Sequence, residues 1–406
     1  MNPRKLAVFT FSLGMACALS TGCGGSSSHT NVASNPVNTI AQSGNNVAPI
    51  SVNSGPAGNY VDGAFVSVTV CVPRTSTCQT ISDLLVDTGS TGLRLLSSAL
   101  TISLVQQNSS GGSPVVECLP FLNTYTWGPV QSADVEIAGE KASSVPVQVL
   151  SDTDFTVPTG CKNLGLTAAD TLPTLGANGI LGVGLFAQDC GSACSQTGTT
   201  NPGLYYECPS SGCQVTAEGL TQQVQNPVAL FASDNNGVII ELPAASAPAA
   251  TLTGSLVFGI GTQSNNALGT ATVYTPDANG NFTTTYKGAS YNTSFIDSGS
   301  NGYFFLDSTI TGLTDCGSAE SGFYCPSSTA NISATNQGSN GASGPVNFSV
   351  ANAATLFSQN DSVFSDLGGP APGMFDFGLP FFFGRNVYTA IEGKSTSGGT
   401  GPFWAY

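Results

Sequence analysis

The chain contains one ten-residue pattern twice, and each copy sets an aspartate in a tight turn. The first copy is LLVDTGSTGL at 84–93 and the second is SFIDSGSNGY at 294–303. In both, an apolar run precedes the Asp, then a hydroxyl residue, Gly and Ser follow, and a second Gly closes the turn. One such loop is a weak motif, but two copies flanked by β-type runs indicate two related lobes. We expect Asp87 and Asp297 to meet in one site; the alternative is two ordinary Asx-type turns.

Length and composition favour a folded, β-rich protein. With 406 residues the chain can form two domain-sized cores. Its 49 glycines, many Ser and Thr, and short apolar stretches between turn residues are typical of β-structure rather than of long amphipathic helices. A hydrophobic content of 40% excludes a disordered chain.

The ionisable residues exclude several classes of function. Acids outnumber bases 24 to 9 and there is no basic run, which argues against nucleic-acid binding. The single histidine, His29, lies in a Ser/Asn/Gly-rich stretch, so Ser-His-Asp, Cys-His and His-ligated zinc mechanisms lack their base or ligand. We expect no cofactor and no metal. The side chains that are left for acid-base chemistry are the carboxylates of Asp and Glu.

The N-terminus predicts export. Arg4 and Lys5 precede an apolar stretch that ends at Leu19, followed by a small-residue segment and Cys23. This layout predicts a signal peptide over residues 1–23, with Cys23 as a lipidated cysteine; ordinary cleavage near Ala18 is the alternative. Residues 24–49 then read as a Ser/Asn/Gly-rich tether. We expect a bacterial cell envelope lipoprotein of the outer membrane or periplasm, or a secreted protein, whose only membrane contact is the anchor at Cys23.

Ten cysteines remain after Cys17 and Cys23, and an even number in an exported chain indicates disulfides. Close spacing predicts the pairs Cys71 with Cys78, Cys118 with Cys161, and Cys316 with Cys325. The other four allow three connectivities or, as a rival interpretation, a metal site. These four are Cys190, Cys194, Cys208 and Cys213.

The paired loops resemble those of pepsin-like aspartic peptidases, and the similarity extends beyond them. Asn178–Gly184 resembles the segment that supports the first catalytic loop in that family, and Gly254–Gly259 resembles an early strand of the second lobe. Leu379–Thr389 resembles the second support segment, with its glycine either replaced by Pro380 or supplied by Gly378. The chain also resembles a family of uncharacterised bacterial lipoproteins, which supplies no activity.

The resemblance implies an all-β, bilobal, pepsin-like double β-barrel with a central cleft and few short helices. Residues 50–240 would form the N-terminal lobe carrying Asp87, and 241–406 the C-terminal lobe carrying Asp297. Asp87 and Asp297 would then be the catalytic dyad. The hydroxyls of Thr88 and Ser298 would cross-link the two loops beneath the site. Ser90 and Ser300 would donate hydrogen bonds to the carboxylates from the side, and Gly89 and Gly299 would donate from the backbone.

The flap of that family, a hairpin whose tyrosine covers the substrate, corresponds to the hairpin with the return limb Asp134–Gly139. Tyr125 or Trp127 would be its aromatic residue. The implied activity is an exported aspartic endopeptidase acting as a monomer on peptide or protein substrates. The alternative is a catalytically silent lipoprotein that binds peptides or a protein partner in its cleft.

Overall fold

The computed structural model describes residues 39–151, 153–162 and 164–406. The predicted signal peptide, Cys23, His29 and most of the predicted tether lie outside these residues. Strand β1 begins at Val47, inside the stretch predicted as a tether. No helix in the described part of the chain has the length and apolar character needed to cross a membrane.

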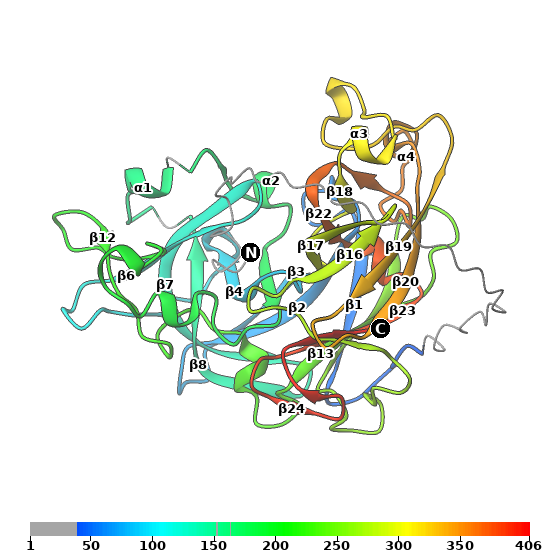
Figure 1. Ribbon diagram of the computed structural model, residues 1–406. Helices are drawn as coiled ribbons and strands as arrows, with labels where there is room; N and C mark the ends of the chain where they lie inside the picture. The colour runs from blue at the N-terminus through cyan, green and yellow to red at the C-terminus, as the bar shows by residue number, and fades with distance from the viewer. Residues whose placement is uncertain (1–38, 152, 163) are drawn as a thin grey trace.

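The fold is all-β with two lobes, as the sequence predicts (Figure 1). Among the described residues, one sheet has 17 strands, one has 7 and one has 2. The strands of the large sheet are β1 (Val47–Asn53), β2 (Gly63–Cys71), β3 (Cys78–Asp87), β4 (Thr91–Leu96), β5 (Val105–Gln106), β6 (Val115–Pro120), β7 (Thr124–Ile137), β8 (Glu140–Leu150), β9 (Thr167–Ala168), β10 (Gly179–Val183), β11 (Tyr205–Glu207), β12 (Gln214–Val215), β13 (Gly237–Leu242), β14 (Leu252–Phe258), β15 (Val273–Tyr274), β23 (Arg385–Ala390) and β26 (Phe403–Ala405).

The seven-stranded sheet carries the second aspartate loop. Its strands are β16 (Phe282–Tyr286), β17 (Ala289–Ile296), β18 (Tyr303–Leu306), β19 (Ala330–Gln337), β20 (Ser343–Val350), β21 (Gly368–Gly369) and β22 (Ala371–Phe377), and the small sheet contains β24 (Ser395–Thr396) and β25 (Gly399–Thr400). The helices are short: α1 (Thr159–Lys162), α2 (Leu172–Leu175), α3 (Ser308–Thr311), α4 (Ala353–Phe357) and single 3₁₀ turns η2 (Ser97–Ala99), η3 (Gly191–Ala193), η4 (Gly198–Thr200), η5 (Pro227–Leu230), η6 (Ser318–Glu320) and η7 (Leu379–Phe382).

The repeated sequence pattern folds into a repeated arrangement of three strands. In the first lobe β10 lies between β3, to which it is parallel, and β4, to which it is antiparallel. In the second lobe β22 lies in the same way between β17 and β18. The residues before the two aspartates, Val86 and Ile296, pair with Leu181 and Phe377 and are completely buried in one apolar core. Each Asp therefore follows a strand that is fixed by neighbours on both sides.

Strands from the two ends of the chain connect the lobes. β1 pairs with β2 and with β14, β14 pairs with β13, and β13 pairs with β23. The predicted division of the chain at residue 240 falls within β13 and stays a prediction.

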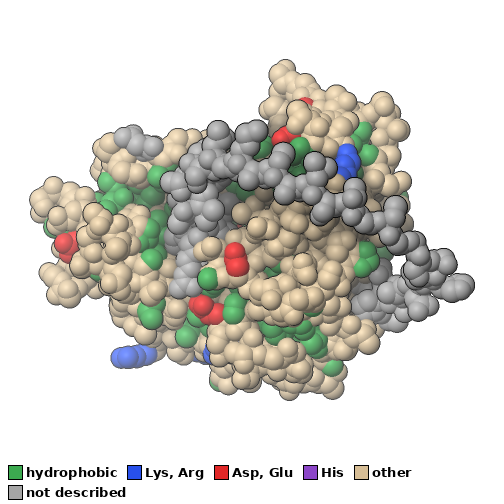
Figure 2. Space-filling view, viewed as in Figure 1, with side chains coloured by type: hydrophobic (Ala, Val, Ile, Leu, Met, Phe, Trp, Pro, Cys, Tyr) green, Lys and Arg blue, Asp and Glu red, His purple; other side chains and the backbone are tan. Residues whose placement is uncertain are grey.

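All ten predicted cysteines form disulfides. The three pairs predicted from spacing are confirmed, and the remaining four connect as Cys190–Cys194 and Cys208–Cys213. The rival metal-site interpretation is therefore wrong, because these sulfur atoms are bonded to each other. Five disulfides are typical of an extracellular or periplasmic protein. Figure 2 shows the sparse charge on one face of the molecule, where red and blue side chains are scattered among neutral ones.

Candidate active site

Each aspartate accepts hydrogen bonds from the turn that follows it. The backbone N–H groups of Gly89 and Ser90 donate to Oδ1 of Asp87 at 2.8 and 3.1 Å. The N–H of Gly299 donates to Oδ1 of Asp297 at 2.8 Å. These donors hold the two carboxyl groups in matching orientations. The repeated D-[ST]-G-S sequence predicts such a pair of matching turns.

The two turns are joined by reciprocal hydrogen bonds beneath the carboxyls. The N–H of Thr88 donates to the hydroxyl of Ser298 at 3.1 Å, and the N–H of Ser298 donates to the hydroxyl of Thr88 at 2.9 Å. Each hydroxyl then donates across to the opposite strand, Ser298 to the carbonyl of Val86 and Thr88 to that of Ile296. Both side chains are buried, so these bonds fix one loop against the other.

The two carboxyl groups lie close together. A Cβ atom placed on Gly299 would be 2.8 Å from Oδ1 of Asp87 and 3.2 Å from Oδ1 of Asp297, so these oxygens are at most about 6 Å apart. A Cβ on Gly89 would lie 2.2 Å from Oδ2 of Asp297, where no side chain fits. Glycine is therefore required at both positions, because each loop passes directly against the other loop's carboxyl group.

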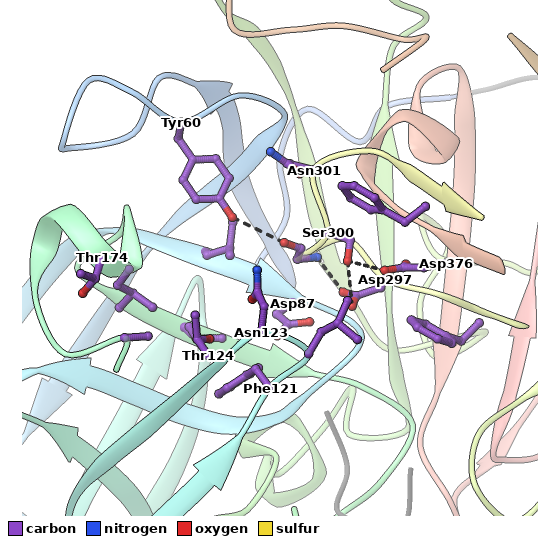
Figure 3. Close-up of a pocket in the computed structure, with 18 residues that line it drawn as sticks. Tyr60, Asp87, Phe121, Asn123, Thr124, Thr174, Asp297, Ser300, Asn301 and Asp376 are labelled. Atoms are coloured by element: carbon purple, nitrogen blue, oxygen red, sulfur yellow. Dashed lines mark hydrogen bonds between the residues drawn. The ribbon is translucent and has the colours of Figure 1, made fainter. Parts of the chain in front are cut away.

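The carboxyls face a cavity of about 400 Å³ between the lobes (Figure 3). Both lobes supply its walls. The lining residues are Tyr60, Leu85, Asp87, Phe121, Leu122, Asn123, Thr124, Ala169, Thr174, Leu175, Ile180, Phe295, Asp297, Gly299, Ser300, Asn301, Phe304 and Asp376. None of these described residues is Lys, Arg or His, so the cavity combines apolar walls with acidic groups.

Both predicted support segments lie behind the aspartate loops. In the first lobe the N–H of Gly184 donates to the carbonyl of Ser90 at 2.8 Å. In the second lobe the N–H of Leu379 donates to the carbonyl of Ser300 at 2.7 Å. A Cβ on Gly378 would lie 2.2 Å from the carbonyl oxygen of Gly302, so Gly378 supplies the close approach, and Pro380 belongs to the following turn η7.

The lateral serines behave differently in the two lobes. The hydroxyl of Ser90 donates to Oδ2 of Asp87 at 2.5 Å. The hydroxyl of Ser300 lies 3.4 Å from Oδ2 of Asp297 but 2.6 Å from Oδ2 of Asp376. Asp376 is 2% exposed and brings a third carboxyl group to the site. Sequence reasoning missed it, because only the pairing of β22 with β17 brings it beside the second loop.

The hairpin of β6 and β7 reaches the cavity with its tip rather than with the predicted aromatic residues. Phe121, Leu122, Asn123 and Thr124 line the cavity. Tyr125 and Trp127, the two flap candidates, line a second cavity of about 220 Å³, where the indole N–H of Trp127 donates to the carbonyl of Phe155. Side chains alternate between the two faces of a strand, which places Thr124 and Tyr125 on opposite sides.

Tyr60, which the sequence did not single out, lines the cavity from the connection between β1 and β2. Its ring lies between two glycines, since a Cβ on Gly63 or Gly176 would come within 2.5 or 2.4 Å of it. Its hydroxyl donates to the carbonyl of Gly299 in a long bond of 3.5 Å. Burial, together with the charges of Asp87 and Asp297, raises the pKa of Tyr60 above its ordinary value, so the phenol stays a hydrogen-bond donor.

The chain is similar to a protein family and to solved structures. A solved structure similar to this chain is an aspartic proteinase from Irpex lacteus, with 14% identity and a TM-score of 0.46 over 88% of this chain and 96% of that chain. No curated protein matches the chain. The model of the family described as "Protein of unknown function (DUF3443)" matches residues 41–406, and the chain belongs to that family.

Proposed function

We propose that this protein is an aspartic-type endopeptidase that hydrolyses peptide bonds with a water molecule activated by Asp87 and Asp297. One observation carries the proposal: two carboxyl groups from different lobes face each other in one cavity, on loops joined by reciprocal hydrogen bonds. Two facing carboxyls without a neighbouring cation do not both stay ionised, so the pair shares one proton.

The proposed reaction uses both protonation states of the pair. The ionised carboxylate takes a proton from a water molecule as the water oxygen attacks the scissile carbonyl carbon. The protonated carboxyl donates its proton to the carbonyl oxygen, which gives a neutral tetrahedral intermediate. When the C–N bond breaks, the proton taken from the water passes to the leaving amine nitrogen, and a hydroxyl proton of the intermediate returns to the pair. The pair is then again singly protonated.

The cavity supports a peptide as the substrate. Leu85, Ile180, Phe295 and Phe304 offer apolar walls from both lobes, and Phe121 and Leu122 reach it from the hairpin tip. Apolar walls around a few fixed polar groups suit a side chain beside a reacting carbonyl. We further propose that the protein is exported and anchored through a lipid on Cys23, which the disulfides and the N-terminal sequence support.

The test is incubation of the purified exported protein with a peptide library from about pH 3 to pH 7, with cleavage read by mass spectrometry. Asp87→Asn and Asp297→Asn are the matched controls, because Asn keeps the size of the side chain but cannot carry the proton. We expect cleavage by the wild type, blocked by a statin-type inhibitor, and none by either variant. A protein that binds the inhibitor or peptides but cleaves none would be a binding protein with this cleft instead.

A further inference from the structure

The Ser300 hydroxyl lies between two carboxyl groups but has one hydrogen to donate. Its oxygen is 2.6 Å from Oδ2 of Asp376 and 3.4 Å from Oδ2 of Asp297. The shorter contact has the length of a charge-assisted O–H···O bond and the longer one exceeds the ordinary range. Figure 3 marks both contacts with dashed lines. The distances assign the hydrogen of Ser300 to Asp376.

The first lobe has the opposite arrangement at the corresponding place. Ile180 pairs with Leu85 two residues before Asp87, just as Asp376 pairs with Phe295 two residues before Asp297. An apolar residue in one lobe thus corresponds to an acid in the other, and both line the cavity. The hydroxyl of Ser90 donates to Asp87 at 2.5 Å, in addition to two backbone donors. Asp87 therefore has three donors from its own turn, whereas the hydroxyl of Ser300 is directed to another carboxyl group.

We propose that Asp376 is a positioning residue for the carboxyl pair: it takes the Ser300 hydrogen and adds a negative charge beside Asp297, so that the shared proton resides on Asp297 and Asp87 is the base. This inference rests on the proposed function for its consequence in catalysis. The position of the proton itself can be measured without turnover.

The described ionisable residues that share the cavity of Asp376 or lie on the strands paired with β22 are few. Asp87, Asp297 and Tyr60 share its cavity, and Tyr60 is neutral because its pKa is raised. The strands that pair with β22 carry Tyr291 on β17 and Tyr303 on β18. Burial raises the pKa of Tyr303 to about 12, so it is neutral as well.

Tyr303 in turn interacts electrostatically with Arg385, Asp62 and Asp366. The guanidinium of Arg385 lies over the ring of Phe381, 4.5 Å from its centroid, and donates to the carbonyl of Phe381. Arg385 does not line the cavity.

The expected effect follows from the sign of the charge. A negative carboxylate beside Asp297 makes loss of the shared proton less favourable, so the pair keeps that proton to a higher pH. Removing the charge with Asp376→Asn should move the titration of the Asp297 carboxyl to lower pH by about one unit. The alkaline limb of peptide hydrolysis should move in the same direction.

The test is ¹³C NMR of the full exported protein labelled at its aspartate carboxyls, followed through a pH titration. Resonances that disappear in Asp87→Asn and Asp297→Asn identify the pair. Asp376→Asn keeps the shape of the side chain, and Asp376→Ile copies Ile180 of the first lobe in case the amide does not fold. Glu136→Gln is the control, because it removes one acid that lines neither cavity.

The proposal expects the Asp297 resonance to titrate above that of Asp87, and to titrate about one unit lower in both Asp376 variants but not in Glu136→Gln. Equal midpoints in the wild type and in a folded Asp376 variant would overturn it, as would a higher midpoint for Asp87. The titration needs no substrate. Failure to cleave peptides would therefore refute the proposed function without affecting the measured midpoints of the carboxyls.

Discussion

Individual hydrogen bonds distinguish the two serines that the sequence makes equivalent. Both follow the pattern D-[ST]-G-S, and sequence reasoning assigned them one role. The structure shows Ser90 bonded to its own aspartate and Ser300 bonded mainly to Asp376. A local pattern therefore predicts which residues stand beside the carboxyls, but the partner of a hydroxyl depends on a strand that joins from elsewhere in the chain.

This difference predicts unequal effects of the same substitution. Ser90→Ala should reduce kcat/KM roughly 5- to 30-fold, which corresponds to about 1 to 2 kcal/mol, because it removes a hydrogen-bond donor to the Asp87 carboxyl. Ser300→Ala should reduce kcat/KM by less, because its hydrogen serves Asp376. Steady-state kinetics on matched peptide substrates measure both. Ser82→Ala is the control, since Ser82 also donates to an aspartate, Asp83, but at an exposed site on β3. A larger loss for Ser300→Ala than for Ser90→Ala would contradict the arrangement described here.

The elements that carry the site could be predicted where a short segment encodes them. The strands before Asp87 and Asp297, the turns after them and the support strand β10 all follow from contiguous sequence. Tyr60 could not be found in this way, because its place at the cavity depends on Gly63 and Gly176, which are distant from both aspartates. The glycine of the second support segment needed the observed register of β22 to be identified.

The predicted return limb of the hairpin, Asp134–Gly139, covers the far end of β7, which pairs with β2 and β8. The part of β7 that pairs with β6 comes earlier, at residues 125–129. Pro120 pairs with Tyr125, and the N–H of Phe121 donates to the carbonyl of Thr124, which leaves a tight turn at the tip. Sequence reasoning favoured the aromatic residues Tyr125 and Trp127, whose side chains pack on the other face. The base of the hairpin is fixed by Glu117 of β6, which forms a buried ion pair with Arg94 of β4 at 3.1 Å.

Because the hairpin tip lines the cavity, it should contribute to substrate binding. Phe121→Ala should raise KM by about 5- to 30-fold with a smaller change in kcat, since it removes apolar contact area without touching the carboxyls. Leu220→Ala is the matched control, because Leu220 is an apolar residue that is 44% exposed and lines neither cavity. Trp127→Phe should leave KM unchanged. An increase in KM for Trp127→Phe alone would show that the aromatic residue, and not the tip, covers the substrate.

At the scale of the whole molecule, several acids in the described part of the chain are buried. Burial raises the pKa of Glu218 to about 7 and that of Glu241 to about 7, from an ordinary value of 4.5. Burial also raises the pKa of Asp62 well above its ordinary value. The chain has 24 acidic and 9 basic residues, so few bases are present to balance these acids.

These shifts predict that the protein is most stable in acid. As pH rises from about 4.5 to about 7, the unfolded chain releases the protons of Glu218 and Glu241 while the folded protein still holds them. The folded state then binds more protons than the unfolded state, so the free energy of unfolding falls as pH rises through this window. The stabilising contribution is complete below pH 4.5 and is lost above about pH 7.

Thermal unfolding measured at intervals across this window tests the prediction, with Tm expected to fall toward neutral pH. Glu241→Gln should reduce the slope, because glutamine does not titrate and its side-chain oxygen can still accept the N–H of Ala41. Glu136→Gln, whose side chain is 38% exposed and bonded to Lys141, should leave the slope as it is in the wild type. A Tm that rises between pH 5 and pH 7, or an unchanged slope in Glu241→Gln, would mean that these carboxyls are ionised in the folded protein and that water or nearby dipoles stabilise their charge.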